Sequence, residues 1–165
     1  MDEIAAWLVG RLPGEWFTGA PSVSVDREEI VVVGDLAVPE VAGDEAAVRA
    51  GEAGRIKRWR EETRGQRMTI ADEAEARYGR KVSWGASCGQ TRQLFTHLAV
   101  PVMTRLRQPE REVLDTLVEA GIARSRSDAL AWAVRLVGQH HEDWIAELQN
   151  ALQAVREARA AGPSA

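Results

Sequence analysis

The stretch Val102-Met103-Thr104-Arg105-Leu106-Arg107 decides the fold of the second half of this 165-residue chain. A period of two residues divides the stretch between the two faces of a β-strand, with Val102, Thr104 and Leu106 on one face and Met103, Arg105 and Arg107 on the other. Pro101 and Pro109 flank it, which argues against a helix. Because no adjacent strand follows, the predicted partner is the same strand of a second copy, which implies an obligate homodimer.

Two helices are predicted after this strand. Pro109 suits the first position of the first helix, and Gly121 suits a left-handed cap beyond its end. Ser125 with Asp128 three residues later is a capping box that opens the second helix. The apolar positions expected on the buried faces are Val113, Leu114, Leu117 and Val118 in the first helix, and Ala129, Leu130, Ala133, Val134 and Val137 in the second.

In order and spacing, these three elements resemble the ribbon-helix-helix family of DNA-binding repressor modules. The matching segments are MTRLR at 103–107, PEREVLDTLVEAG at 109–121 and SRSDALAWAVRLV at 125–137. In that family, two antiparallel strands of a dimer enter the major groove of DNA. The resemblance implies two sets of contacts: Met103, Arg105 and Arg107 on base edges, and Ser125, Arg126 and Ser127 on a backbone phosphate at a helix N-terminus.

The function that this resemblance implies is a homodimeric, sequence-specific transcription regulator whose partner is double-stranded DNA, and not an enzyme. The strand normally lies near the N-terminus of such proteins, whereas here residues 1–95 precede the module. This difference indicates a larger regulator with an added domain, whose own partner stays open among a metabolite, another protein and further DNA. Two alternatives also stay open: an architectural, sequence-tolerant DNA-binding protein, and a protein-interaction dimer that never contacts DNA.

Charge is distributed unevenly along the chain, whose formal net charge is −4. Residues 1–54 have three basic and eleven acidic side chains, whereas residues 55–107 have twelve basic and five acidic ones. Residues 108–165 have six basic and nine acidic side chains. An acidic front beside a basic middle that ends on the predicted strand is the asymmetry expected of a nucleic-acid-binding protein.

The pattern before residue 96 predicts a small α+β domain. We expect a helix over 4–12, a hairpin over 22–26 and 29–33, a loop over 36–43, helices over 44–65 and 68–78, and a strand over 82–86 that joins the hairpin. The chain as a whole is therefore predicted to be α+β, in three parts: an α+β domain of unknown role at 1–95, the ribbon-helix-helix module at 96–138, and a helical extension with a flexible tail at 139–165.

A basic cluster lies in and just after the first long helix. Its members are Arg55, Lys57, Arg58, Arg60, Arg80 and Lys81. Basic side chains around Trp59 are typical of a second nucleic-acid surface that attracts phosphates. A solvated helix face, partly neutralised by Glu61 and Glu62, produces the same pattern. Both interpretations stay open.

Neither an enzymatic site nor a metal site is predicted. Cys88 and His97 stand nine residues apart, which establishes no geometry for a nucleophile and its base. The segment 85–90, GASCGQ, lacks the lysine and the spacing of a phosphate-binding loop. His140 and His141 are neighbours that point to different sides of a helix, and no further histidine stands at ligand spacing. We therefore expect no cofactor and no metal.

The expected location is the cytoplasm, in association with the nucleoid. Residues 1–12 do not form a secretory signal, because Asp2 and Glu3 stand at its start, and no apolar run is long enough to span a membrane. A single cysteine excludes an intrachain disulfide framework.

Overall fold

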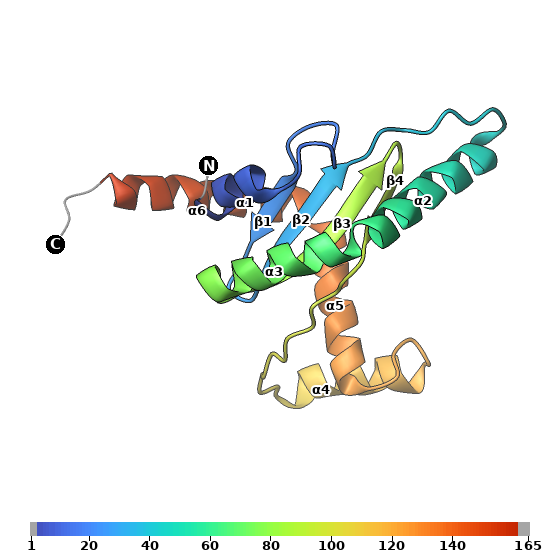
Figure 1. Cartoon of the computed structure of the whole chain (residues 1–165). Helices are drawn as coiled ribbons and strands as arrows, with labels where there is room; N and C mark the ends of the chain where they lie inside the picture. The colour runs from blue at the N-terminus through green and yellow to red at the C-terminus, as the bar shows by residue number, and fades with distance from the viewer. Residues whose placement is uncertain (1–2, 162–165) are drawn as a thin grey trace. The chain divides into compact units, whose positions relative to one another are not determined.

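The structure, a computed structural model that describes residues 3–161, confirms the α+β class. The chain divides into two compact units, Met1–Pro101 and Val102–Ala165 (Figure 1). Each unit has its own cluster of buried apolar side chains.

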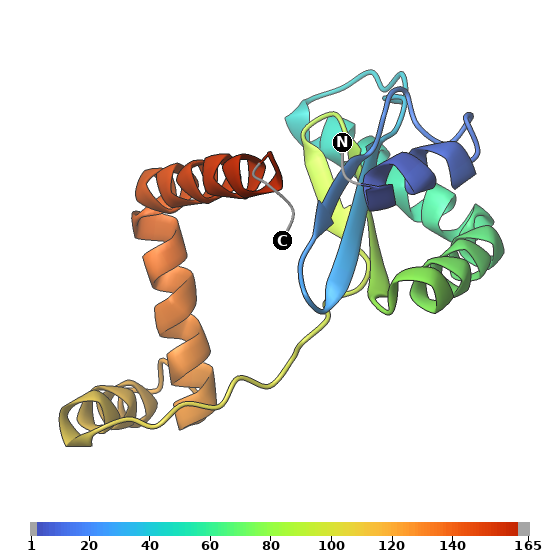
Figure 2. The same ribbon diagram turned by 90° about the vertical axis from the view of Figure 1, so that its left-hand side faces the viewer.

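A four-stranded sheet with the order β1-β2-β3-β4 forms the first unit. Its strands are β1 (Ser22–Val25), β2 (Glu29–Asp35), β3 (Lys81–Cys88) and β4 (Thr91–Leu94). Its helices are α1 (Glu3–Arg11), α2 (Glu45–Glu62) and α3 (Arg64–Tyr78). The strands β2 and β3 are parallel and are joined through α2 and α3, whereas the outer pairs are antiparallel. Figure 2 shows the three helices on one face of the sheet.

The core of the first unit lies between this sheet and the helices. Alternate residues of the central strands, among them Ile30, Val32 and Trp84, are buried against the apolar faces of the helices. Trp16, in the connector before β1, is at the centre of this core, with ring centroids 5.5 Å from Trp59 and 6.1 Å from Trp84. These edge-on aromatic contacts fix the connector against both layers.

The predicted helix over 4–12, the hairpin and the strand that joins it are all confirmed. Two features differ from the prediction. The helix expected from Met68 begins at Arg64, because Thr63 ends α2 and at once precedes α3. The strand β4 was not predicted, since its sequence TRQL has no apolar alternation.

The turn between β3 and β4 depends on a carboxylate from α2. Glu52 is buried, and its oxygens accept hydrogen bonds from the backbone N–H of Gln90 and from the backbone N–H and hydroxyl of Thr91. The hydroxyl of Thr91, then the two backbone N–H groups, hold the pKa of Glu52 below its ordinary value. Gly89 has φ +56°, and an added Cβ would stand 1.9 Å from a Glu52 oxygen.

The second unit consists of an extended segment and three helices. The helices are α4 (Gln108–Glu119), α5 (Arg126–His140) and α6 (Glu142–Ala160). Leu114, Ala123 and Ala129 are its buried apolar residues, and Gly121 (φ +72°) makes the left-handed turn after α4, as the sequence predicts. Leu106, Leu117, Val118 and Leu130 pack around this cluster.

Part of the predicted buried face is open to solvent in the single chain. The exposed fractions are 59% for Val113, 65% for Val134 and 49% for Val137. Large apolar side chains of α6 are exposed as well: Trp144, Leu148, Leu152 and Val155. Periodicity placed the α5 residues on an apolar stripe, but this chain alone does not cover the whole stripe. None of the helices within residues 3–161 is both long and apolar enough to cross a membrane.

We expect Gly89→Ala to lower the free energy of unfolding by about 1–2 kcal/mol, because it combines a left-handed backbone with a clash against the Glu52 carboxylate. Gly54→Ala is the matched control. It adds a methyl group to the middle of α2 with no heavy atom within 4 Å, and should raise the free energy of unfolding by up to about 1 kcal/mol. Urea unfolding of the full chain, followed by circular dichroism, measures both. Equal effects would show that Glu52 does not constrain this turn.

Candidate nucleic-acid interface

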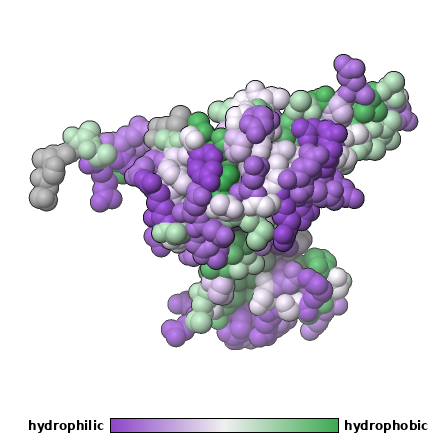
Figure 3. All heavy atoms as spheres, viewed as in Figure 1, coloured by the Kyte–Doolittle hydropathy of each residue, from purple (hydrophilic) through white to green (hydrophobic). Residues whose placement is uncertain are grey.

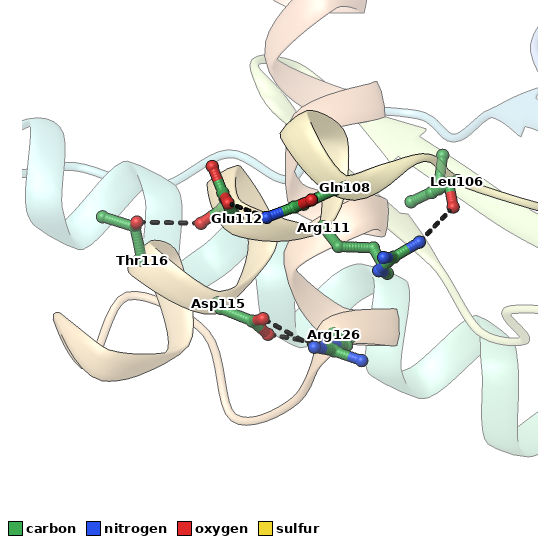
Figure 4. Close-up of polar contacts among 7 residues, drawn as sticks. All are labelled: Leu106, Gln108, Arg111, Glu112, Asp115, Thr116 and Arg126. Atoms are coloured by element: carbon green, nitrogen blue, oxygen red, sulfur yellow. Dashed lines mark hydrogen bonds and ion pairs between the residues drawn. The ribbon is translucent and has the colours of Figure 1, made fainter.

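The segment 102–107, predicted as a β-strand, is not a strand in the single chain, because it has almost no hydrogen-bonding partners among the described residues. The described residues contain no strand paired with it. Arg111 provides its only hydrogen bonds in residues 3–161, from the guanidinium to the Leu106 carbonyl at 2.7 Å and from the backbone N–H to the Arg107 carbonyl at 3.1 Å. Figure 4 shows the first of these contacts. The remaining backbone groups are free to form a ladder with another strand.

The side chains of the segment differ between its two faces. Leu106 is half-buried against the cluster around Leu114. Met103 is 95% exposed, and Arg105 and Arg107 are exposed with no acidic partner among the described residues. Val102, predicted to share the inner face with Leu106, is 86% exposed in the single chain. The three candidate base-contacting side chains are therefore all accessible, while part of the inner face is uncovered.

The N-terminus of α5 has the Ser125 half of the predicted capping box, whereas the Asp128 side chain bonds to the residue before the N-cap. The Ser125 hydroxyl accepts a hydrogen bond from the backbone N–H of Asp128 at 3.2 Å, and the Asp128 carboxylate accepts one from the backbone N–H of Arg124 at 3.0 Å. The Arg124 N–H, and then the charge of the Arg124 side chain, lower the pKa of Asp128. The first intrahelical hydrogen bond runs from Ala129 to Ser125. The backbone N–H groups of residues 126 and 127 precede it and are available to an anion.

The Arg126 side chain is directed elsewhere. Its guanidinium forms a two-pronged ion pair with Asp115 of α4, with both N–O distances 2.6 Å (Figure 4). This hydrogen-bonded pairing lowers the pKa of Asp115 and raises that of Arg126. Arg126 can therefore approach a phosphate through its backbone, whereas its charge is neutralised by Asp115.

Arg124, which sequence reasoning did not select, precedes the cap of α5. Its side chain is 94% exposed and its nitrogen stands 3.6 Å from an Asp128 oxygen. The signal for it was present in the sequence, because it is the basic residue next to the N-cap Ser125. Its exposed guanidinium is better placed than that of Arg126 to meet a phosphate.

The predicted basic cluster of the first unit does not form one surface. Lys57 and Arg60, three residues apart, share a face of α2 that lines a cavity, whereas Arg55 and Arg58 lie on another face. Several members have acidic neighbours: Lys57 with Glu61, Arg58 with Glu62, and Lys81 with Glu75. Arg80 is half-buried. Figure 3 shows hydrophilic side chains over α2 and α3.

The residues considered for enzymatic and metal sites are not assembled into one. Cys88 is buried in β3, where desolvation raises the pKa of its thiol, and His97 is exposed beyond β4. His141 ends α5, and its ring lies against Trp144. Within residues 3–161 no three histidine, cysteine or carboxylate side chains are grouped as metal ligands.

Comparisons with known proteins place both units in one group. Residues 2–94 match the N-terminal domain of Rv1265-like proteins, and residues 107–159 match the Mb1296 C-terminal domain. The uncharacterized protein Rv1265 of Mycobacterium tuberculosis (strain H37Rv) is 64% identical over 159 residues, which are 96% of this chain and 70% of the relative. The uncharacterized protein Mb1296 of Mycobacterium bovis has the same identity and coverage. No solved structure matches the chain.

We expect Ser125→Ala to lower the free energy of unfolding by about 1 kcal/mol, because it removes the side-chain cap of α5. Ser127→Ala, two residues along the same helix, removes no hydrogen bond of this cap and should change the free energy by less than about 0.5 kcal/mol. Urea unfolding of the full chain, monitored by helical circular dichroism, distinguishes the two variants. Equal losses would contradict the assignment of Ser125 as the cap.

Proposed function

This chain belongs to the family of Rv1265-like proteins, and for this member we propose the function of a homodimeric, sequence-specific DNA-binding transcription regulator. Two extended segments 102–107, one from each copy, form an antiparallel ribbon that enters the major groove. Met103, Arg105 and Arg107 contact base edges, and the N-terminus of α5 holds a backbone phosphate. The protein acts in the cytoplasm, at the nucleoid, and not as an enzyme.

The observation that best supports this proposal is the segment itself. It forms no helix, its backbone groups lack a ladder, and two helices follow it, with Gly121 after α4 and Ser125 before α5 in their predicted capping positions. Pairing with the same segment of a second copy would satisfy these backbone groups in the geometry of a two-stranded ribbon, which the major groove admits.

The uncovered apolar side chains support the same assembly. Val102 on the segment and Val134 and Val137 on α5 are exposed in the single chain and stand on faces that periodicity assigns to a core. A second copy related by two-fold symmetry would present the same side chains in return, because a two-fold interface is self-complementary. The exposed stripe of α6 is a further surface for this contact.

The arginines of the second unit support the assignment of the base contacts. Arg111 and Arg126 are held by contacts within the unit. Arg105 and Arg107 have no such partner among residues 3–161. An arginine without an internal partner can present its fork of donors to guanine, a geometry that lysine does not reproduce.

Val102→Asp tests the dimer without disturbing the single chain. Val102 is 86% exposed in one copy, so a charge there costs little unless a second strand covers it. We expect light scattering at micromolar concentration to show a dimer that dissociates about tenfold or more readily, with the helical signal retained. Met103→Asp is the matched control, because its side chain is 95% exposed on the opposite face, and it should remain dimeric. A monomeric parent protein, or equal behaviour of the two variants, would overturn the ribbon.

Arg105→Ala tests sequence-specific DNA binding. The full chain is incubated with a random-sequence duplex library at about 50 and about 200 mM salt, and bound DNA is sequenced. We expect a two-fold symmetric motif that persists at higher salt. Arg105→Ala should weaken binding to that motif by about 1–3 kcal/mol and relax its sequence preference. Arg156→Ala removes the same charge from α6 and should leave the preference unchanged.

Two other outcomes would point to other functions. Binding without enrichment, lost at the higher salt concentration, would indicate an architectural DNA-binding protein. The absence of binding at both salt concentrations would contradict the proposal and favour a protein-interaction dimer.

A further inference from the structure

An open cavity of about 790 Å³ lies in the first unit, between the helices α2 and α3 and the strands β3 and β4. Its size is within the range of small-molecule sites, which is roughly 300–1,000 Å³. The helices contribute residues at intervals of three and four from Ala53 to Ala71, and the sheet contributes Trp84 and Phe95. All of these belong to one compact unit.

The wall of this cavity includes a buried arginine without a carboxylate partner. Arg67 is 7% exposed. Its guanidinium donates to the Thr63 hydroxyl at 3.0 Å and to the Arg60 carbonyl at 2.6 Å, and both acceptors are uncharged. No ion pair among residues 3–161 includes it. Desolvation, and then the nearby charges of Arg60 and Arg64, lower the pKa of Arg67 to about 10. A buried charge without a counter-ion is costly, and proteins commonly pair such groups.

The other charges around the cavity are mostly of the same sign. Lys57, Arg60 and Arg64 line it together with Arg67, and the one carboxylate in the lining is that of Glu61, which stands 4.0 Å from Lys57. Four cations around one concave site repel each other unless an anion enters. Their convergence therefore favours a ligand with more than one negative charge.

The remaining wall is aromatic and includes an unused hydrogen-bond donor. The guanidinium groups of Arg60 and Arg67 lie 5.1 and 5.3 Å from the ring centroid of Phe95. The indole N–H of Trp84 is buried and has no hydrogen-bond partner among the described residues. Rings stacked by guanidinium groups provide a flat surface for a planar ligand.

We propose that this cavity binds a small organic phosphate with a planar ring, of the nucleotide class, whose phosphate contacts Arg60, Arg64 and Arg67. The ring lies against Phe95 and Trp84. A duplex is a poorer occupant, because its rigid phosphate backbone cannot follow a cavity wall to a buried residue such as Arg67, whereas a small phosphate can enter a cavity of this size. The proposal concerns the first unit and holds independently of DNA binding by the second.

Calorimetric titration of the full chain with three probes tests the site: a purine nucleoside monophosphate, the uncharged nucleoside and inorganic pyrophosphate. We expect the nucleotide to bind, pyrophosphate to bind more weakly, and the nucleoside not to bind. The double variant Arg60→Gln/Arg64→Gln should weaken nucleotide binding about tenfold or more, because each replaced group hydrogen-bonds a charged ligand. Both side chains are exposed, so the variant should fold.

The matched control is Arg55→Gln/Arg58→Gln, which removes two charges from α2 outside the cavity lining and should bind within about twofold of the parent protein. Arg67→Met should abolish binding, and the surface double variant keeps the test decisive if this buried variant does not fold.

The absence of binding of every phosphate probe at millimolar concentration would overturn the proposal. So would binding that both double variants weaken equally. Loss of duplex binding in Arg60→Gln/Arg64→Gln, without any small-molecule binding, would instead make the cavity rim a second nucleic-acid surface.

Discussion

Unpaired backbone groups in the segment 102–107 are the constraint on which the second unit depends. Pro101 and Pro109 flank the segment and oppose its conversion into a helix, so that most of its N–H and C=O groups have no hydrogen-bond partner within residues 3–161. The second unit buries only three apolar residues, Leu114 in α4, Ala129 in α5 and Ala123 in the connection, which is too small a core to stabilise a unit of this length well. The missing hydrogen bonds and the missing apolar burial belong to the same unit, and the proposed pairing of two copies would supply both.

The first unit, in contrast, covers its own apolar core and pairs the strands of its own sheet. Three helices cover one face of a four-stranded sheet, and Trp16 ties the connector to both layers. Even the buried carboxylate of Glu52 is satisfied within the unit, because it accepts hydrogen bonds from a turn nearly forty residues away and needs no basic partner. Against this background Arg67 is the exception, because it is buried and no carboxylate among residues 3–161 forms an ion pair with it. Local inconsistencies of this kind in an otherwise consistent fold are expected at binding sites.

Much of this architecture could be predicted from periodicity, because the helices and central strands bury one regular face. The remainder depends on contacts between residues distant in sequence. The strand β4 has a polar sequence and is held in place by Glu52, 39 residues before Thr91, so no local pattern reveals it. The ion pair between Asp115 and Arg126 joins two helices and was equally invisible. Arg67, in contrast, could have been found, since it stands on the apolar stripe of α3 three residues before the buried Ile70.

The formal net charge of −4 bears on how such a protein recognises DNA. A binding protein with a large positive charge gains affinity for any duplex through counterion release. Its binding free energies for specific and non-specific DNA are then both large, and their difference, which sets the specificity, is small by comparison. Here the acidic residues 1–54 oppose that general attraction. Asp115 neutralises Arg126 at the start of α5, which in the proposed complex would remove a further sequence-independent contribution. Arg105 and Arg107, the side chains that face bases in the proposed ribbon, are among the arginines of the second unit that have no ion pair within residues 3–161. In the proposed dimer, four arginines would lie on one ribbon. Affinity and sequence preference would then arise in part from the same contacts.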